Sequence, residues 1–394
     1  MTDAASADLE GPAAERVQAR VNLAAIERNC ARLHAGLLRG GALCAVVKAN
    51  GYGHGAVQSA RAALSGGASW LAVVGARELL ELREAGLDQV RVLVMGALTA
   101  TELREALAAD GDVVVWNEGY LRAVEQAGGG RVHVKLDSGM GRLGTRDPIE
   151  GLAVAEAASR SPDVELVGAM THFATADDLE DEGFFAQQLA SFTAWAAQIR
   201  AKWPGVLIHA ANSAATLRDQ AAHFDMVRCG IAIYGMDPYG EDPAARGLEP
   251  ALELSSYVAD VKRCAAGESA GYGRRFIAER DTSIGLLPIG YGDGWRRALS
   301  NNAEVLIAGR RHPVVGTVSM DSITVDLGAQ ADPEQTRGER AILIGLQGGE
   351  RITAEEVATR LGTINYEVTC GLTPRVPRVY HRDNVPEAAG TSST

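Results

Sequence analysis

The feature that most constrains the fold is an alternation of short apolar runs with longer helical segments between about residues 40 and 236. The runs are Leu43–Lys48, Trp70–Val74, Val90–Met95, Asp112–Trp116, Val132–Leu136, Leu166–His172, Val206–Ala210 and Met226–Tyr234. Segments with helical periodicity lie between them, for example Ala76–Ala85, Ala100–Ala108, Ile149–Arg160 and Phe184–Lys202. Apolar strands separated by amphipathic helices are typical of a parallel sheet, and eight such units predict an α/β fold with a (β/α)8 TIM-type barrel. A doubly wound open sheet is the alternative, but its Gly-x-Gly-x-x-Gly fingerprint is missing after the first run.

After about residue 245 the pattern changes to short strands joined by turns: Leu252–Arg263, Thr282–Ile289, Ala303–Ala308, His312–Val315 and Ile323–Leu327. Residues Ala308–His312 fit a hairpin loop. Only Thr353–Leu361 reads as a helix, with Thr353 as its N-cap. We therefore expect a barrel over residues 16–245 and a mostly antiparallel C-terminal β domain over residues 246–384. The tails, residues 1–15 and 385–394, are expected to be disordered.

Lys48 stands at the end of the first apolar run, directly before the glycine-rich segment Ala49–Gly55. Partial burial disfavours the charged form of an ammonium, so a lysine there can act as a Schiff-base nucleophile or a general base. A lysine that only extends its charge into solvent from a strand end is the alternative. The pentad Gly51–Gly55 favours a site, because it requires several unusual backbone positions.

Further candidate residues end or follow the expected fifth, sixth and seventh strands, where barrels carry their catalytic groups: Lys135, Asp137, Arg142, His172, Asn212 and Ser213. Arg228 and Gly230 lie along the eighth. Most have a structural alternative. His172 can be a satisfied core histidine, Arg142 a surface ion-pair partner, and the pair Asn212–Ser213 a helix N-cap. Arg228 is harder to explain in this way, because an arginine within a buried strand needs a partner. Their convergence on one face of the barrel predicts a site.

This set of groups suits a phosphate-bearing aldehyde cofactor. Barrels commonly bind phosphate with the loops after strands 7 and 8, where Ser213 and the backbone of Gly230 and Ile231 can donate hydrogen bonds. Lys48 would form an imine with the aldehyde, and pyridoxal 5'-phosphate is the cofactor that needs both features. Arg228 would face the ring nitrogen and leave it unprotonated, since an arginine keeps its proton. The weaker electron sink that results suits proton transfer and suppresses decarboxylation and transamination.

Composition excludes several classes of partner. The formal charge of −12 argues against a nucleic-acid surface. The acidic N-terminus lacks the apolar core of a signal peptide, and no run is long enough to span a membrane. The cysteines are scattered and odd in number, which favours free thiols over a disulfide framework or a zinc site: Cys30, Cys44, Cys229, Cys264 and Cys370. We expect a soluble, cytoplasmic protein.

The motifs resemble those of bacterial alanine racemases, the fold-type III enzymes that depend on pyridoxal phosphate. The resemblance covers about residues 18–382 and rests on Ala45–Gly55, Lys135–Gly144, Thr171–Ala174, Ala211–Ala215, Val227–Ile231, Gly271–Gly273, Pro288–Gly294, Val318–Asp321, Asn365–Glu367 and Arg375–Arg378. It implies interconversion of L-alanine and D-alanine, which supplies D-alanine for peptidoglycan.

The resemblance also implies the role of each site residue. Lys48 exchanges the α-proton with the D enantiomer, and Tyr272, reaching the site of the other subunit of a homodimer, exchanges it with the L enantiomer. A free tyrosine titrates near pKa ~10, so the family supports it with a network that corresponds to His172 and Arg228. Arg142 and the Met320 backbone of the partner subunit are implied to bind the substrate carboxylate. The phosphate is implied to be surrounded by Tyr52, Ser213, Ile231 and Tyr366, and Tyr291 is implied to close the entry. Lys135 matches a lysine that is carbamylated in some members, where it orients the arginine corresponding to Arg142.

Three other functions stay open. A pyridoxal phosphate carrier on the same barrel would lack the β domain that contains Tyr272, Met320 and Tyr366. A fold-type III decarboxylase would carry an acidic residue in place of Arg228. A racemase for serine or for several amino acids is the closest rival, because small changes in apolar volume discriminate substrates only about 10–200-fold.

Overall fold

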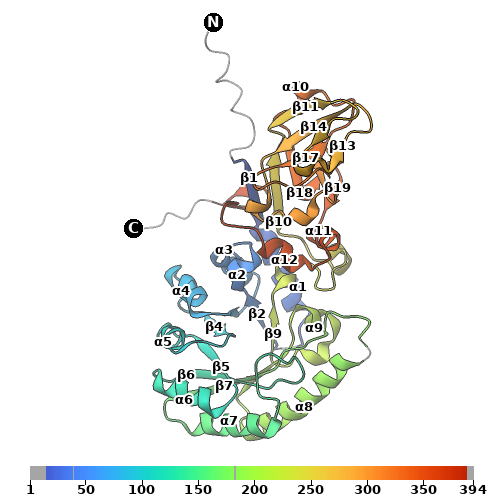
Figure 1. The fold of residues 1–394 in the computed structure, drawn as a ribbon. Coiled ribbons are helices and arrows are strands. Elements are labelled where there is room, and N and C mark those ends of the chain that lie inside the picture. The colour runs from blue at the N-terminus through green and yellow to red at the C-terminus, as the bar shows by residue number, and fades with distance from the viewer. Residues whose placement is uncertain (1–14, 39, 182, 388–394) are drawn as a thin grey trace. The chain divides into compact units, whose positions relative to one another are not determined.

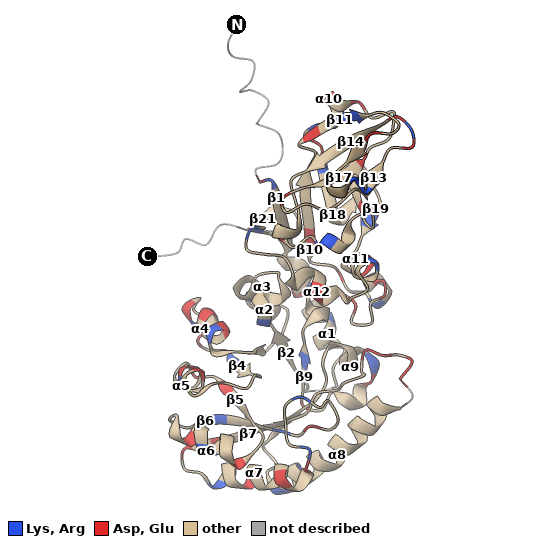
Figure 2. Cartoon of the chain, in the orientation of Figure 1, with Lys and Arg blue, Asp and Glu red and all other residues tan. Residues whose placement is uncertain are grey.

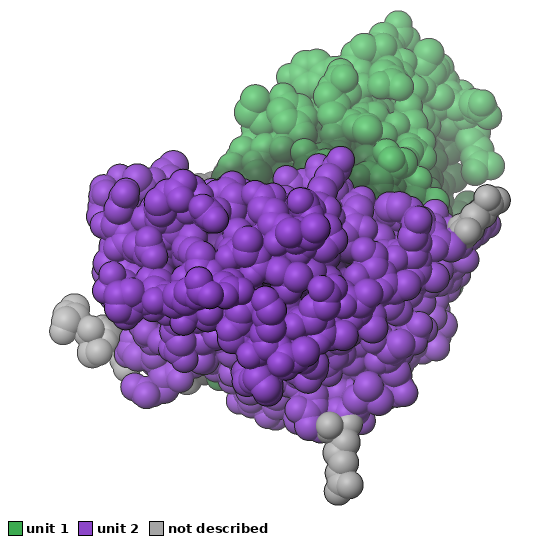
Figure 3. All heavy atoms as spheres, turned by 90° about the horizontal axis from the view of Figure 1, so that it is seen from below, with its two compact units in different colours: residues 1–23, 250–394 green, residues 24–249 purple. Residues whose placement is uncertain are grey.

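The computed structural model describes residues 15–38, 40–181 and 183–387, so most of both expected tails lies outside the described residues. The chain divides into two compact units, residues 24–249 and residues 1–23 with 250–394 (Figure 3). The expected domain boundaries differ from these units at the N-terminus. Residues 17–22, which the sequence analysis assigned to the barrel domain, form strand β1 (Val17–Asn22) in the sheet of the C-terminal unit.

The unit of residues 24–249 is a closed barrel of parallel strands (Figure 1). Its strands are β2 (Ala42–Val46), β3 (Trp70–Val73), β4 (Arg91–Val94), β5 (Asp112–Val115), β6 (Gly130–Lys135), β7 (Val164–Met170), β8 (Leu207–His209) and β9 (Met226–Cys229). Strand β2 pairs with β9 and closes the barrel, with Cys44 opposite Arg228. The predicted (β/α)8 TIM-type barrel is confirmed. All four residues of β5 are buried, which explains why these strands read as continuous apolar runs.

Helices connect the strands: α1 (Leu23–Ala35) before the barrel, then α2 (Lys48–Tyr52), α3 (Ala56–Ser65), α4 (Ala76–Glu84), α5 (Ala100–Ala108), α6 (Glu118–Gln126), α7 (Pro148–Arg160), α8 (Phe184–Lys202) and α9 (Ser213–Arg218). Short 3-10 turns follow at η1 (Gln220–Ala222), η2 (Ile231–Tyr234) and η3 (Pro243–Arg246). Side-chain caps fix where several helices begin. Thr99 and Glu102 form a reciprocal capping box at α5, and the Asn117 side chain accepts from the N–H of Tyr120 at α6.

The other unit is built on a large sheet with strand order β11-β14-β17-β16-β15-β18-β10-β1-β20-β21, and β19 pairs with β18. Beside β1, its strands are β10 (Leu252–Tyr257), β11 (Asp260–Cys264), β14 (Thr282–Leu287), β15 (Glu304–Ile307), β16 (Arg310–Val315), β17 (Ile323–Asp326), β18 (Arg340–Gln347), β19 (Glu350–Ile352), β20 (Arg378–Arg382) and β21 (Val385–Pro386). A separate small hairpin joins β12 (Ser269–Ala270) to β13 (Phe276–Ile277). Neighbouring strands are antiparallel except for the parallel pair β1–β20, which confirms the mostly antiparallel β domain.

The turns and helices of this unit match the sequence analysis in part. The helix α11 (Ala354–Leu361) begins after Thr353, whose side chain accepts from the N–H of Glu356 at 3.1 Å. The predicted hairpin loop narrows to Ala308–Gly309, where both φ angles are positive, as a two-residue hairpin turn requires. The expectation of only one helix is wrong, because the short segments α10 (Pro333–Thr336) and α12 (Asn365–Cys370) are also helical. Segments this short give no helical periodicity in the sequence. The 3-10 turns of this unit are η4 (Tyr272–Arg274), η5 (Tyr291–Asp293) and η6 (Arg297–Leu299).

Acidic and basic side chains are interspersed along the elements of each unit (Figure 2). Among the described residues, no helix combines the length and the apolar character that crossing a membrane requires. None of the five cysteines, all of which lie in the described part of the chain, forms a disulfide; four are buried and Cys370 is exposed.

Candidate active site

Lys48 begins a strained turn directly after β2. The sequence analysis placed Lys48 at the end of the strand, but the strand ends at Val46, two residues earlier. The next four residues, 49–52, have φ angles of 53, 53, 60 and 51° and form a left-handed helical turn. Three of them are not glycine, and each such residue costs roughly 1–2 kcal/mol in this conformation. Strain of this kind persists only where surrounding contacts hold it, and it is concentrated at functional sites.

Hydrogen bonds from neighbouring elements hold this turn. The N–H of Ala49 donates to Glu78 Oε1 at 2.7 Å, and Asn50 Oδ1 accepts from the N–H of Ala56 at 3.0 Å. A residue of α4 thereby holds the backbone at Ala49, and a residue of α3 holds the side chain of Asn50. Lys48 itself is partly buried.

The end of this turn packs against the segment after β9. The Tyr52 ring lies 5.2 Å from that of Tyr234, whose hydroxyl donates to the carbonyl of Val46 at 3.0 Å. A Cβ on Gly230 would lie only 2.4 Å from Tyr52 Oη. Glycine at position 230 therefore lets the tyrosine hydroxyl lie directly over the backbone. The structure thus brings together Tyr52 and Gly230, two residues that the sequence analysis assigned to the phosphate site.

Ser213 links the loops after β8 and β9. Its Oγ accepts from the N–H of Gly230 at 2.9 Å and from that of Ala232 at 3.3 Å. A hydroxyl that accepts twice still has its own proton to donate. The helix-cap alternative is correct for the preceding residue, because Asn212 Oδ1 accepts from the N–H of Ala215 at 2.9 Å. Asn212 is therefore the helix cap, and the next residue, Ser213, faces the loop after β9.

Arg228 is fully buried on β9, and hydrogen bonds hold both ends of its guanidinium fork. Its NH1 donates to His209 Nδ1 at 2.8 Å, and its NH2 donates to the carbonyls of Thr171 and Ala210 at 2.8 and 2.9 Å. NH2 also lies 3.3 Å from His172 Nδ1. No carboxylate contacts it within the described part of the chain, and none of the hydrogen bonds there uses its Nε. Burial lowers the pKa of Arg228 to about 10, so it stays protonated at neutral pH and one donor is left for a ligand.

His172 follows β7 and presents Nδ1 to Arg228, so its proton resides on Nε2. Burial, followed by the charges of Arg228 and Lys135, holds the pKa of His172 well below its ordinary value. His172 is therefore a neutral imidazole that accepts from the buried Arg228 at Nδ1 and can donate the proton on Nε2 to a further group. The alternative of a core histidine satisfied by backbone groups does not describe it.

Lys135 and Arg142 flank the loop after β6. Lys135 is buried, and burial together with the charges of Arg228 and Arg142 lowers its pKa to about 8. The carboxylate of Asp137 shapes the loop by accepting from the N–H groups of Gly139 and Gly141. Arg142 is exposed, and none of the ion pairs among the described residues includes it, which removes the surface ion-pair alternative.

The remaining predicted site residues belong to the C-terminal unit. Tyr272, Met320 and Tyr291 are 73, 51 and 42 % exposed, whereas Tyr366 on α12 is partly buried. The exposed three share one scaffold. Thr317 Oγ1 donates to the carbonyl of Tyr272 at 2.7 Å. The N–H of Tyr291 donates to the carbonyl of Ser319 at 3.0 Å, and that of Gly292 to the carbonyl of Met320 at 2.9 Å.

Known proteins match this chain over nearly its whole length. The family models for the alanine racemase N-terminal and C-terminal domains match residues 21–238 and 251–380. The chain belongs to the alanine racemase family. It is 40% identical to alanine racemase 1 of Bacillus subtilis (strain 168) over 92% of either chain, and 40% identical to the alanine racemase of Thermobifida fusca over 92% of this chain and 97% of that protein. The crystal structure of alanine racemase from E. faecalis has a TM-score of 0.87 and 37% identity, covering 93% of this chain and 98% of that chain.

Sequence analysis missed one part of this racemase's barrel. Asp112 on β5, His133 on β6 and His209 on β8 are completely buried. Asp112 is hydrogen-bonded to His133, His133 to His209, and His209 to Arg228. A signal was available, because the argument that singled out Arg228, a charge within a buried strand, applies equally to Asp112.

Proposed function

We propose that this protein interconverts L-alanine and D-alanine with pyridoxal 5'-phosphate as cofactor and so supplies D-alanine for peptidoglycan. The membership in the alanine racemase family establishes the enzyme class, an amino-acid isomerase. Arg228 is the observation that carries the proposal of cofactor and mechanism. A buried arginine with no carboxylate partner and an unused Nε is suited to a ring nitrogen that must be hydrogen-bonded but not protonated.

The donors around Ser213 fit a phosphate group. The Ser213 hydroxyl has its proton free to donate, and no hydrogen bond among the described residues uses the N–H of Ile231. The sequence analysis also assigned the N–H of Gly230 to the phosphate, but that N–H already donates to Ser213 Oγ. The site as built therefore offers Ser213, Ile231 and the Tyr52 hydroxyl, and Tyr366 is proposed with them.

When bound, pyridoxal phosphate withdraws electron density from the α-carbon of an amino acid and so makes its α-proton acidic. The protein residues then move that proton. For L-alanine, the oxygen of Tyr272 takes the α-proton from one face, and Nζ of Lys48 delivers a proton to the α-carbon from the opposite face. The reverse sequence converts D-alanine, and each cycle leaves the total number of protons unchanged. Arg142 and the Met320 backbone bind the substrate carboxylate, and Tyr291 closes the entry.

We propose further that the active enzyme is a homodimer in which Tyr272 serves the site of the partner subunit. The exposure of Tyr272, Met320 and Tyr291 on one hydrogen-bonded scaffold supports this, because clustered exposed aromatic and apolar side chains mark interaction surfaces.

Lys135 is proposed to carry a carbamate. Its pKa of about 8 leaves a substantial neutral fraction near neutral pH, and the neutral amine attacks carbon dioxide to form an N–C bond with release of one proton. The new negative charge would lie beside Arg228 and Arg142, whose charges already act on Lys135. Labelled bicarbonate should then give a carbamate signal in carbon NMR that Lys135→Gln abolishes. A signal that survives Lys135→Gln would exclude this site.

The cytoplasm is the proposed compartment. The free thiols of the described chain suit a reducing environment. Nothing in the proposed chemistry requires a nucleic acid or a membrane.

The test of the reaction is racemisation by the purified protein with added pyridoxal phosphate, followed by chiral chromatography on L-alanine, L-serine and L-lysine. Alanine should be turned over faster than the other two. Comparable rates would indicate a broad-specificity racemase. No turnover by protein that visibly holds the cofactor would overturn the proposal.

The test of the shared site is complementation between two inactive variants, Lys48→Ala and Tyr272→Phe. If each site takes its lysine and its tyrosine from different subunits, a mixed dimer contains one intact site. Random pairing then recovers about a quarter of the wild-type activity. Sites built within one subunit would recover none, even when differential tags show that mixed dimers have formed.

A further inference from the structure

A chain of buried hydrogen bonds crosses the barrel interior and ends on Arg228. Arg228 NH1 donates to His209 Nδ1 at 2.8 Å. His209 Nε2 lies 2.9 Å from His133 Nδ1, and His133 Nε2 lies 3.1 Å from Asp112 Oδ2. None of these four side chains is more than 2 % exposed. The proton transfers proposed above use Arg228 but do not require the other three.

The two ends of the chain determine the proton positions along it. A guanidinium can only donate, so His209 must accept at Nδ1 and carry its proton on Nε2. That proton can be donated only if His133 accepts at Nδ1 and carries its own proton on Nε2. An ionised carboxylate can only accept, so Asp112 completes the series in the same direction. Both histidines are thus held in the Nε2–H tautomer.

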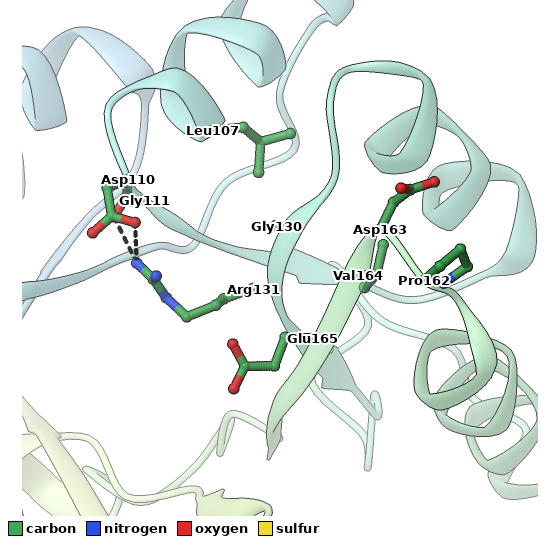
Figure 4. A pocket seen from close by; sticks show the side chains of 9 residues that line it. All are labelled: Leu107, Asp110, Gly111, Gly130, Arg131, Pro162, Asp163, Val164 and Glu165. Carbon is green, nitrogen blue, oxygen red and sulfur yellow. Dashed lines mark hydrogen bonds and ion pairs between the residues drawn. The ribbon is translucent and has the colours of Figure 1, made fainter.

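Asp112 is anchored as a carboxylate at the other end. Arg131 Nε donates to its Oδ1 at 2.8 Å, Arg91 Nε donates to the same oxygen at 3.1 Å, and Arg91 NH2 pairs with Oδ2. Burial raises the pKa of Asp112, but the hydrogen bonds from His133 and the two arginines outweigh it and lower the pKa to about 2. Arg131 also donates to Asp110 and lines a cavity of about 300 Å³ near the start of β6 (Figure 4).

The backbone is adapted to His133. The pairing of β6 with β7 shifts register between Val132 and His133, which is a local irregularity of the kind that redirects a side chain. On β7, a Cβ at Gly168 would lie 1.9 Å from His133 Nδ1, so only glycine leaves room for the ring. Burial lowers the pKa of His133, and burial followed by the charge of Arg228 places the pKa of His209 well below its ordinary value. The chain is therefore neutral between its charged ends.

We propose that Asp112 and His133 are positioning residues for the cofactor, which act by fixing the tautomer of His209 and thereby the orientation of the Arg228 guanidinium. With His209 in the other tautomer, its Nδ1–H would face the donor NH1 of Arg228, and that hydrogen bond would be lost. The guanidinium would then be free to turn, and Nε would no longer be directed consistently at the ring nitrogen. The inference rests on the proposed cofactor for its consequence, but the tautomers themselves do not depend on it.

The deciding variant is Asp112→Asn, which keeps the shape but leaves one acceptor oxygen for the four N–H donors of Arg91, Arg131 and His133. If the amide oxygen serves the two arginine Nε groups, the amide NH2 takes the place of Oδ2. It then faces His133 Nε2 and reverses the chain, while Arg91 NH2 loses its acceptor. The matched control is Asp110→Asn, which also neutralises a partner of Arg131 but lies outside the chain and is largely exposed. His133→Phe is the second variant, since it breaks the link to His209 and leaves Asp112 paired with both arginines.

The first readout is nitrogen NMR of the histidine-labelled protein without cofactor, with signals assigned through His133→Phe and His209→Gln. In the wild type both rings should be neutral, with the proton on Nε2. In Asp112→Asn the His209 signals should move toward the Nδ1–H tautomer, and Asp110→Asn should leave them unchanged. In His133→Phe the Nε2 proton of His209 loses its acceptor while Arg228 still donates to Nδ1, so the shift should be smaller than in Asp112→Asn. If His209 keeps the wild-type tautomer in Asp112→Asn, the proposal is overturned, whatever the protein catalyses.

The second readout is the cofactor itself. Loss of a group that orients a ligand typically costs roughly 10–100-fold in affinity or rate in comparable sites, so we expect a drop of that size in cofactor affinity and in kcat, with KM for alanine less affected. The absorbance of the bound cofactor should also become pH-dependent in Asp112→Asn. Unchanged spectra and affinity in a variant whose His209 tautomer has switched would overturn the positioning role. Failure of the wild type to racemise alanine would instead contradict the proposed function, which separates the two.

Discussion

The two units of this racemase present their polar groups in opposite ways. In the barrel, Arg228, His172 and Lys135 are withdrawn from water and connected by hydrogen bonds or electrostatics within one chain. In the C-terminal unit, Tyr272 and Met320 are more than half exposed and only their backbones are fixed. The barrel groups are thus held in place before any ligand binds, whereas the exposed side chains of the β unit are the ones that the proposed homodimer would cover. Preorganised polar groups are a major source of catalytic power, and in the barrel such groups surround the buried Arg228.

The largest effect should come from the barrel side of this comparison. Lys48→Ala removes both the cofactor anchor and one base, so racemisation in both directions should fall at least about 10⁴-fold. Borohydride should no longer fix the cofactor to the protein. Lys202→Ala, on α8 of the same unit, is the control and should behave as the wild type. A Lys48→Ala protein that still shows the lysine-linked absorbance band would contradict the assignment.

Substitution on the exposed side should abolish proton exchange on one face of the α-carbon only. Tyr272→Phe deletes the oxygen proposed to exchange the α-proton of the L enantiomer, so racemisation should fall roughly 10²–10⁴-fold in both directions. The variant should still bind the cofactor and still exchange the α-proton of D-alanine in deuterated water. Tyr257→Phe on β10 serves as control. Wild-type racemisation by Tyr272→Phe would show that the β unit contributes no base.

Acid should destabilise the barrel more than the β unit. His133, His172 and His209 in the barrel all have lowered pKa values, whereas His381 is the only histidine with a lowered pKa in the described part of the C-terminal unit. Unfolded histidines titrate near ~6.5, so the stabilising contribution is complete above that pH and is lost as the pH falls below it.

The slope per histidine is up to about 1.4 kcal/mol per pH unit. Urea unfolding between pH 7 and pH 5 measures it. His133→Phe should reduce the slope, because the unfolded variant binds one proton fewer. A slope that His133→Phe leaves unchanged would show that this ring already takes up a proton in the folded barrel.

The smallest effect should come from a feature of the β unit that is remote from any proposed chemistry. Thr353→Ala removes the cap of α11 and should lower the free energy of unfolding by about 1 kcal/mol, with kcat and KM unchanged. Thermal unfolding together with the racemisation assay checks both. Restored stability in Thr353→Ser would confirm that the hydroxyl is responsible.

The sequence predicted the barrel closely because its strands are buried on both faces. Val90–Met95 was expected and β4 covers Arg91–Val94, and the predicted Phe184–Lys202 helix matches α8. The strand β1 was not predicted. Its residues alternate between buried and half-buried, and its partners β10 and β20 lie more than two hundred residues away in the sequence.

The candidate site was predictable to the extent that it follows strand ends. The left-handed turn after Lys48 was not, because Ala49 has no preference for positive φ and adopts it where hydrogen bonds to α3 and α4 hold the turn. The partner of the Gly230 N–H was not predictable either. The sequence analysis assigned this N–H to the phosphate, but it donates to Ser213 Oγ, because β8 and β9 bring the two residues together.

The sequence by itself determined the order of apolar and polar segments, and with it a barrel whose candidate site residues lie at or near the carboxyl ends of its strands. It also determined that Arg228 must have partners, because a buried cation is too costly to leave alone. Only the tertiary structure decided that these partners are two neutral histidines and backbone carbonyls, with Asp112 placed beyond His133 and His209. The reason is physical: covalent spacing sets which residues share a strand, but donor and acceptor directions are set by the register between strands, and that register exists only once the barrel has closed.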